Sequence, residues 1–136
     1  MSQIHNKILE QSGLHEETND DFFWNIIEAI DWKSDQDYVK ARKRLKSLNL
    51  SNKQRQELHA FVVKKYRELD WYVSKIFPPG TSPTCGAEDS YSDYLYSAVG
   101  HGKDYYNSLF DSKHKWDRKE AEEKTVEDFW NVVEID

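Results

Sequence analysis

The three prolines of this 136-residue chain all lie between Pro78 and Pro83, and two of its five glycines lie in or beside the same stretch. Proline and glycine are the residues that most strongly interrupt regular structure. The rest of the chain is nearly free of breakers, which favours helix, and no stretch of about four to eight residues alternates as a strand does. The sequence therefore predicts an all-α, single compact domain over residues 1–136, with six or seven helices and one irregular Pro/Gly-rich loop at about residues 77–89.

The clearest helix is predicted from about Asn52 to Phe77. Ser51 can cap its first turn, and Gln54, three residues later, completes a capping box. Apolar residues recur along this segment at helical spacing, so we expect one stripe of it to be buried. The members of the stripe are Leu58, Phe61, Val62, Leu69, Tyr72, Val73 and Ile76.

Shorter helices are predicted elsewhere from the same kind of pattern. Ser34 is the expected cap of one of them, and Gly102 allows a tight turn into another. Their approximate ranges are residues 4–9, 35–47, 90–100 and 103–111.

One short segment occurs twice. Phe23-Trp24-Asn25 recurs as Phe129-Trp130-Asn131, and in both copies two aliphatic residues and a glutamate follow. We interpret the two copies as the buried stripes of two amphipathic helices, because rings at helical spacing usually lie in a core. The other interpretation is a duplicated binding element in which each tryptophan faces a partner.

The composition is that of a folded, soluble domain. Hydrophobic residues make up 38% of the chain, aromatic residues make up 14%, and the net charge is −6. No window of about eighteen apolar residues exists, so no membrane-spanning helix is expected. The single cysteine excludes an internal disulfide framework and a multi-cysteine metal site, and it fits a reducing compartment, most simply the cytoplasm.

Charge is distributed unevenly along the chain. Residues 1–37 carry nine acids and two bases, whereas residues 38–55 carry seven bases and no acid. The basic segment at residues 40–55 could bind the phosphates of a nucleic acid. We favour a solvated helix face instead, since a nucleic-acid-binding domain is usually basic overall and this chain is acidic.

Candidates for chemistry are few. The five histidines lack the spacing of metal ligands, and there is no Gly-rich phosphate loop. Cys85 and His101 are the best available nucleophile and base, yet no supporting motif accompanies them. We therefore expect no catalytic, cofactor-binding or metal-ligating residue, and we keep a small enzyme that uses Cys85 and His101 as an alternative.

The most site-like cluster combines acids with tyrosines just after the Pro/Gly-rich loop. Tyrosines serve as rigid recognition anchors, and acids speed association with a cationic protein. The alternative is that these rings pack the second half of the domain. The predicted partner-binding residues are Glu88, Asp89, Tyr91 and Asp93, together with the N-terminal acids Glu16, Glu17 and Asp20.

Two blocks carry a resemblance to a known family. They are Asp21–Glu28 (DFFWNIIE) and Ser92–Tyr96 (SDYLY), the latter continued by Gly100–Tyr106 (GHGKDYY). Over about residues 20–112 the chain resembles the bacterial domain-of-unknown-function family 4240, which comprises small helical proteins. The second Phe-Trp segment and the Pro-rich loop are departures from that family. The resemblance implies a helical fold and a bacterial source, and it brings no known activity and no catalytic residues.

These observations favour a non-enzymatic protein-binding domain. Its most specific form is a cytoplasmic immunity protein that binds a cationic toxin, such as a nuclease, in a 1:1 complex and blocks it. Small size, net acidity, abundant rings and the lack of a catalytic pattern motivate it. No membrane partner, no cofactor and no small-molecule substrate are expected, and nucleic-acid binding through residues 40–55 remains an alternative.

Overall fold

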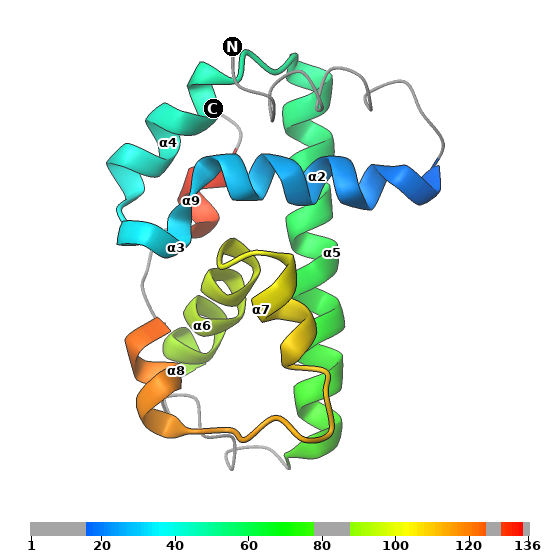
Figure 1. Ribbon diagram of the computed structural model, residues 1–136, viewed down its shortest axis with the longest axis vertical. Coiled ribbons are helices and arrows are strands. Elements are labelled where there is room, and N and C mark those ends of the chain that lie inside the picture. Colours follow the sequence, from blue (N-terminus) through cyan, green and yellow to red (C-terminus); the bar gives the residue numbers. More distant parts are fainter. Residues whose placement is uncertain (1–15, 78–87, 125–128, 135–136) are drawn as a thin grey trace.

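The computed structural model describes residues 16–77, 88–124 and 129–134, and within these ranges all regular secondary structure is helical (Figure 1). The prediction of an all-α chain is therefore confirmed for the described residues. The helix expected at residues 4–9 and most of the loop expected at residues 77–89 lie outside them. The helices are α2 (Glu16–Ile30), α3 (Trp32–Asp35), α4 (Tyr38–Ser47), α5 (Asn52–Ile76), α6 (Glu88–Gly100), α7 (Lys103–Ser108), α8 (Arg118–Lys124) and α9 (Phe129–Val133).

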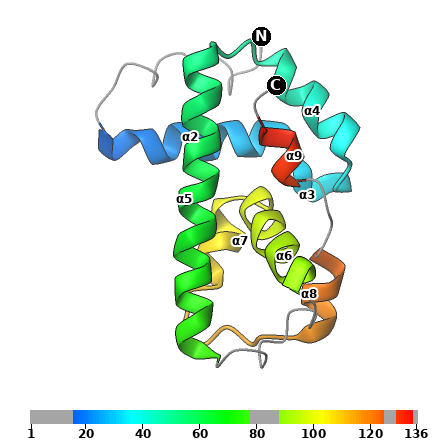
Figure 2. The ribbon, with the colours of Figure 1, turned by 180° about the vertical axis from the view of Figure 1, so that it is seen from behind.

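Helix α5 runs along the long axis of the molecule, and the other helices lie beside it (Figures 1 and 2). Helix α2 crosses α5, and α6 and α7 follow below α2 in the view of Figure 1. Helix α9 comes last in the chain, yet it packs against α4, α5 and α6. The C-terminal segment therefore completes a core that the earlier helices begin.

Aromatic side chains fill much of this core. Trp32, Tyr94 and Phe129 are among the largest fully buried side chains. The rings of Trp32 and Phe129 meet edge to face with centroids 5.3 Å apart, and Trp32 Nε1 donates a hydrogen bond to Ser97 Oγ at 3.0 Å. The buried indole N–H thus has a partner, as buried polar groups require. These contacts join α3, α6 and α9.

Helix α5 buries the predicted stripe along most of its length. Leu58, Phe61, Val62, Leu69 and Val73 are buried, as expected. Tyr72 is only half-buried and Ile76 is 41% exposed, so the stripe ends at Val73 and the last turn of α5 lies outside the core. Neither α5 nor any other helix in the described ranges combines the length and the apolar character needed to cross a membrane.

The helix ends follow local capping chemistry. At the start of α5 the capping box is confirmed, since Ser51 Oγ accepts from Gln54 N at 3.1 Å and Gln54 Oε1 accepts from Ser51 N at 2.9 Å. The predicted cap at Ser34 is wrong. Ser34 lies within the short helix α3, and Asp37 caps α4 instead by accepting from the backbone N–H three residues later at 3.0 Å.

The two copies of the Phe-Trp segment are buried differently. In α2, Trp24 is buried, with its ring centroid 5.2 Å from that of Phe61. In α9, Phe129 is buried but Trp130 is only half-buried. The interpretation of two core stripes is therefore confirmed for α2, and in α9 it holds for Phe129, Val132 and Val133 but not for Trp130.

Candidate functional site

A shallow, open hollow of about 1130 Å³ lies along α5, and we call it the α5 hollow. Most of its lining belongs to α5, where the residues recur three or four positions apart and so share the outer side of the helix. Helices α6 and α9 and the turn that follows α7 supply the remainder. The lining residues are His59, Ala60, Val63, Lys64, Arg67, Glu68, Trp71, Tyr96, Phe110 and Trp130.

A row of aromatic rings in contact with one another forms one wall of the α5 hollow. The ring of Trp130 lies 4.5 Å from that of His59 and 5.1 Å from that of Tyr96, measured between centroids. Tyr96 in turn stacks on Tyr66 at 4.2 Å with an interplanar angle of 16°. Because three helices hold these rings in contact, the wall is formed before any partner arrives.

Trp71 lies further along α5 and is far more exposed than Trp130 or Tyr96. Its side chain is 61% exposed, and Lys75 Nζ lies 4.2 Å from the ring centroid. This distance is typical of a cation–π contact, which at an exposed site contributes only about 0.5–1 kcal/mol. Trp71 is therefore a large apolar surface with a positive charge beside it.

The charges on the lining are mainly positive. Lys64 and Arg67 are exposed, and no carboxylate among the described residues forms an ion pair with either. Glu68 is the acid of the lining, but its Oε2 accepts from Lys65 Nζ at 3.3 Å and from the Tyr106 hydroxyl at 3.2 Å. Glu68 is thus engaged within the fold, although the same lysine also lies 3.4 Å from Asp20 Oδ2.

Among the predicted partner-binding residues, three have described side chains. Asp20 Oδ2 lies 3.4 Å from Lys65 Nζ, and the Tyr91 hydroxyl donates to Asp70 Oδ1 at 2.6 Å. Burial, followed by this hydrogen bond, raises the pKa of Tyr91. Asp93 is half-buried on α6. None of the three lines the α5 hollow. The side chains of Glu16, Glu17, Glu88 and Asp89 lie outside the described part of the structure.

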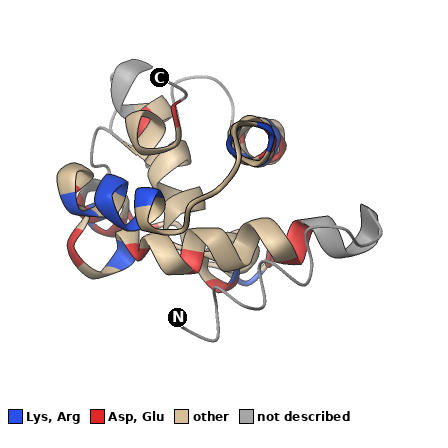
Figure 3. Ribbon diagram, turned by 90° about the horizontal axis from the view of Figure 1, so that it is seen from above, with Lys and Arg blue, Asp and Glu red and all other residues tan. Residues whose placement is uncertain are grey.

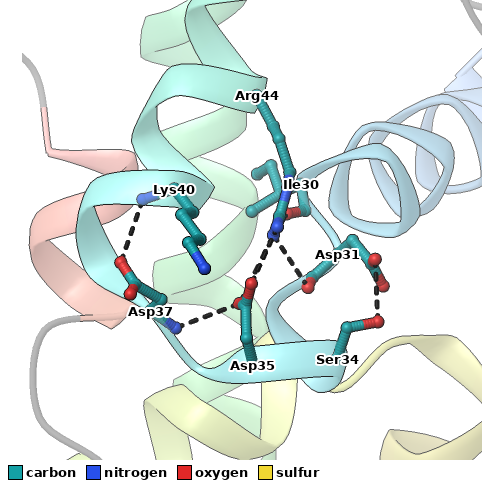
Figure 4. Close-up of polar contacts among 7 residues, drawn as sticks. All are labelled: Ile30, Asp31, Ser34, Asp35, Asp37, Lys40 and Arg44. Carbon is teal, nitrogen blue, oxygen red and sulfur yellow. Dashed lines mark hydrogen bonds and ion pairs between the residues drawn. The ribbon is translucent and has the colours of Figure 1, made fainter.

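Helix α4 holds most of the basic segment (Figure 3), and both of its arginines have internal roles. Arg42 donates to the backbone oxygen of Asn131 at 2.7 Å, at the end of α9. Arg44 donates to the backbone oxygen of Ile30 at 3.1 Å, at the end of α2, and forms an ion pair with Asp35 at 2.8 Å (Figure 4). The hydrogen bond from Arg44 holds the pKa of Asp35 below its usual value. Both arginines therefore satisfy the free carbonyls that helix ends expose.

His101 is engaged within the fold, between α6 and α7. Its Nε2 lies 3.2 Å from Gln36 Oε1, a contact that the Nε2–H tautomer makes as a hydrogen bond, and its ring packs edge-on against Tyr105. Burial lowers the pKa of His101 to about 4, and the charges of Lys124 and Lys33 act in the same direction. Such a pKa makes His101 a weak base at neutral pH. Cys85, its suggested partner, lies outside the described residues.

The low pKa of His101 predicts a pH dependence of stability. We expect the free energy of unfolding to fall as the pH is lowered from about 6.5 to about 4. In this window the imidazole is protonated in the unfolded chain and neutral in the folded chain, so the unfolded state binds more protons. Above the window the imidazole is neutral in both states and has no effect.

Urea unfolding at a series of pH values measures this effect. His101→Gln should flatten the slope between pH 6.5 and 4, whereas His114→Gln, at a half-buried ring beside Trp116, is the matched control. An unchanged slope in His101→Gln would show that other groups cause the acid sensitivity.

Within the described ranges, no three His, Cys, Asp or Glu side chains lie close enough together to hold a metal ion. Comparison with known proteins adds no assignment, since no family model, no curated protein and no solved structure matches the chain. The resemblance to the domain-of-unknown-function family 4240 stays a prediction.

The residues that distinguish the α5 hollow were not among the predicted site residues. Trp71 follows Leu69 by two positions, which places it about 200° around the helix and away from the buried stripe. This offset is a signal that the sequence contains. The sequence points less clearly to the half-exposure of Trp130. The repeated Phe-Trp segment suggested it only through the alternative interpretation, in which each tryptophan faces a partner.

Proposed function

We propose that the protein is a non-enzymatic protein-binding domain and that the α5 hollow is its docking surface. The observation that carries this proposal is the concentration of rings at one open surface, with Trp71, Trp130 and Tyr96 beside Arg67. Tryptophan, tyrosine and arginine are the residues that contribute most binding energy at protein interfaces. A preformed wall of rings also loses little conformational freedom on binding.

The shape of the surface supports a macromolecular partner. Pockets for small molecules are enclosed and bury most of the ligand, whereas the α5 hollow is open along α5. The internal hydrogen bond of His101 and its low pKa favour a structural role for this residue over a catalytic one. Both observations support binding rather than chemistry.

A photo-crosslinking amino acid placed at position 71 tests the proposal in the cells that produce the protein. We expect one dominant adduct from position 71, and we expect Arg67→Ala to weaken it because Arg67 lines the same surface. The matched control is position 39 on α4, where the native valine is 56% exposed and is not among the lining residues of the α5 hollow. Identical adducts from both positions, or none from position 71, would contradict the proposal.

The immunity form of this function is a more specific proposal. It requires that the crosslinked partner be a cationic nuclease, that the two proteins form a 1:1 complex, and that the complex suppress nuclease activity. The mainly positive lining of the α5 hollow does not attract a cationic surface. A toxin docked at the α5 hollow would therefore have to make its ionic contacts with acids outside the lining. A crosslink from position 71 to a protein without nuclease activity would overturn this form alone.

A further inference from the structure

We propose that the α5 hollow binds an acidic protein segment that carries large apolar side chains. This inference rests on the proposed function, because it names the chemistry of the partner at the same surface. The surface offers two features together: cations that form no ion pair with a carboxylate of the described residues, and rings that are exposed or half-exposed. The cations favour acidic side chains of the partner, and the rings favour its apolar side chains.

The positive charge comes from Lys64 and Arg67, with Lys75 next to Trp71. Glu68, the acid of the lining, contacts Lys65 and Tyr106 and forms no ion pair with either Lys64 or Arg67. In the described structure the nearby acid Asp70 likewise accepts from the hydroxyl of Tyr91. Carboxylates of a partner would therefore meet two exposed cations that form no ion pair with any carboxylate of the described residues, and charge complementarity of this kind selects partners.

The rings provide the apolar part of the surface. Trp71 lies at one end and Trp130 at the other, with Val63 and Ala60 on the helix between them. From His59 to Trp71 the helix rises by about 18 Å, the length of about three helical turns or of five to six residues of extended chain. A segment of that size can place one or two apolar side chains against the rings while its acids face Lys64 and Arg67.

A nucleic acid fits this surface less well. Single-stranded nucleic acids bind where cations follow the whole backbone path, with aromatic rings stacked on successive bases. The lining has two cations, the ring of Tyr96 in its wall already stacks on Tyr66, and the chain carries a net charge of −6. An acidic protein segment needs fewer cations and gains more from apolar contact.

The test uses three defined probes and the full-length protein. A random copolymer of glutamate and tyrosine presents the proposed chemistry, a copolymer of lysine and tyrosine reverses its charge, and oligo-dT represents a nucleic acid. Binding is measured by biolayer interferometry with the protein immobilised. We expect the Glu/Tyr copolymer to bind, and we expect Lys64→Glu with Arg67→Glu, or Trp71→Ala alone, to weaken binding about tenfold or more.

The matched control is Lys43→Glu with Lys46→Glu, which makes the same charge change on exposed residues of α4. Equal losses in the two double variants would overturn the inference, because binding would then be non-specific electrostatics. Preference for the Lys/Tyr copolymer, or tighter binding of oligo-dT that the same variants abolish, would also overturn it. If the Glu/Tyr copolymer fails but the crosslink from position 71 persists, the partner chemistry is wrong and the protein-binding function stands.

Discussion

Replacing Trp32 by alanine should lower the free energy of unfolding by about 3–5 kcal/mol, the range for removing a large ring from a core. Trp32 is fully buried, and its ring contacts Phe129 edge to face at 5.3 Å. The substitution also leaves the hydroxyl of Ser97 without the indole N–H that now donates to it. Since α3, α6 and α9 meet at this ring, the loss should affect all three helices.

Chemical denaturation followed by circular dichroism measures this loss, and Trp71→Ala is the matched control. Trp71 is 61% exposed, so the same change of residue there should cost less than about 1 kcal/mol. If Trp32→Ala prevents folding, Trp32→Phe replaces it in the test, because this substitution removes less volume and should lower the free energy of unfolding by less. Equal losses at positions 32 and 71 would contradict the assigned core.

Replacing Gly100 by alanine should destabilise the protein by about 2–3 kcal/mol through overpacking. A Cβ atom at this position would lie 2.6 Å from two carbons of the Phe129 ring and 2.8 Å from Cδ1 of Trp32. Neither ring can move aside freely, because both are buried. Gly100 is therefore the point at which α6 allows α9 to approach.

A double-mutant cycle with Phe129→Leu checks this explanation. Leucine is smaller than phenylalanine, so Phe129→Leu should cost less in the Gly100→Ala background than in the native protein. Because α9 carries Trp130, Gly100→Ala should also weaken partner binding at the α5 hollow. Simple additivity of the two substitutions would show that the added methyl group does not press on Phe129.

Local sequence signals were sufficient for much of the fold. The capping box at Ser51 and Gln54 predicted the start of α5, and the apolar spacing predicted its buried stripe as far as Val73. Gly102 has a φ of +99° directly before α7, as the predicted tight turn needs. Helix α8 was not predicted. Asp37 and not Ser34 caps α4, because two candidate caps lay within a few residues of each other.

The candidate site depended more on tertiary packing. The basic segment of α4 was interpreted as a solvated helix face, with phosphate binding as the alternative; its lysines are exposed, yet Arg42 and Arg44 donate to the ends of α9 and α2. Arg42 is 89 residues from its acceptor in Asn131, so no local pattern could reveal this contact. The wall of the α5 hollow likewise joins rings from helices that are distant in the sequence.

By itself, the sequence determined the helical state of the chain, the limits of its longest helix and the apolar faces that had to be buried. Capping and periodicity act within a few residues, so they can be recognised without a structure. Only the tertiary structure decided which faces meet, and hence that Trp24 is buried while Trp130 lies half-exposed beside Tyr96. Periodicity identifies the buried side of a helix but not the neighbouring helix that covers it. The α5 hollow is formed by the way these neighbouring helices meet.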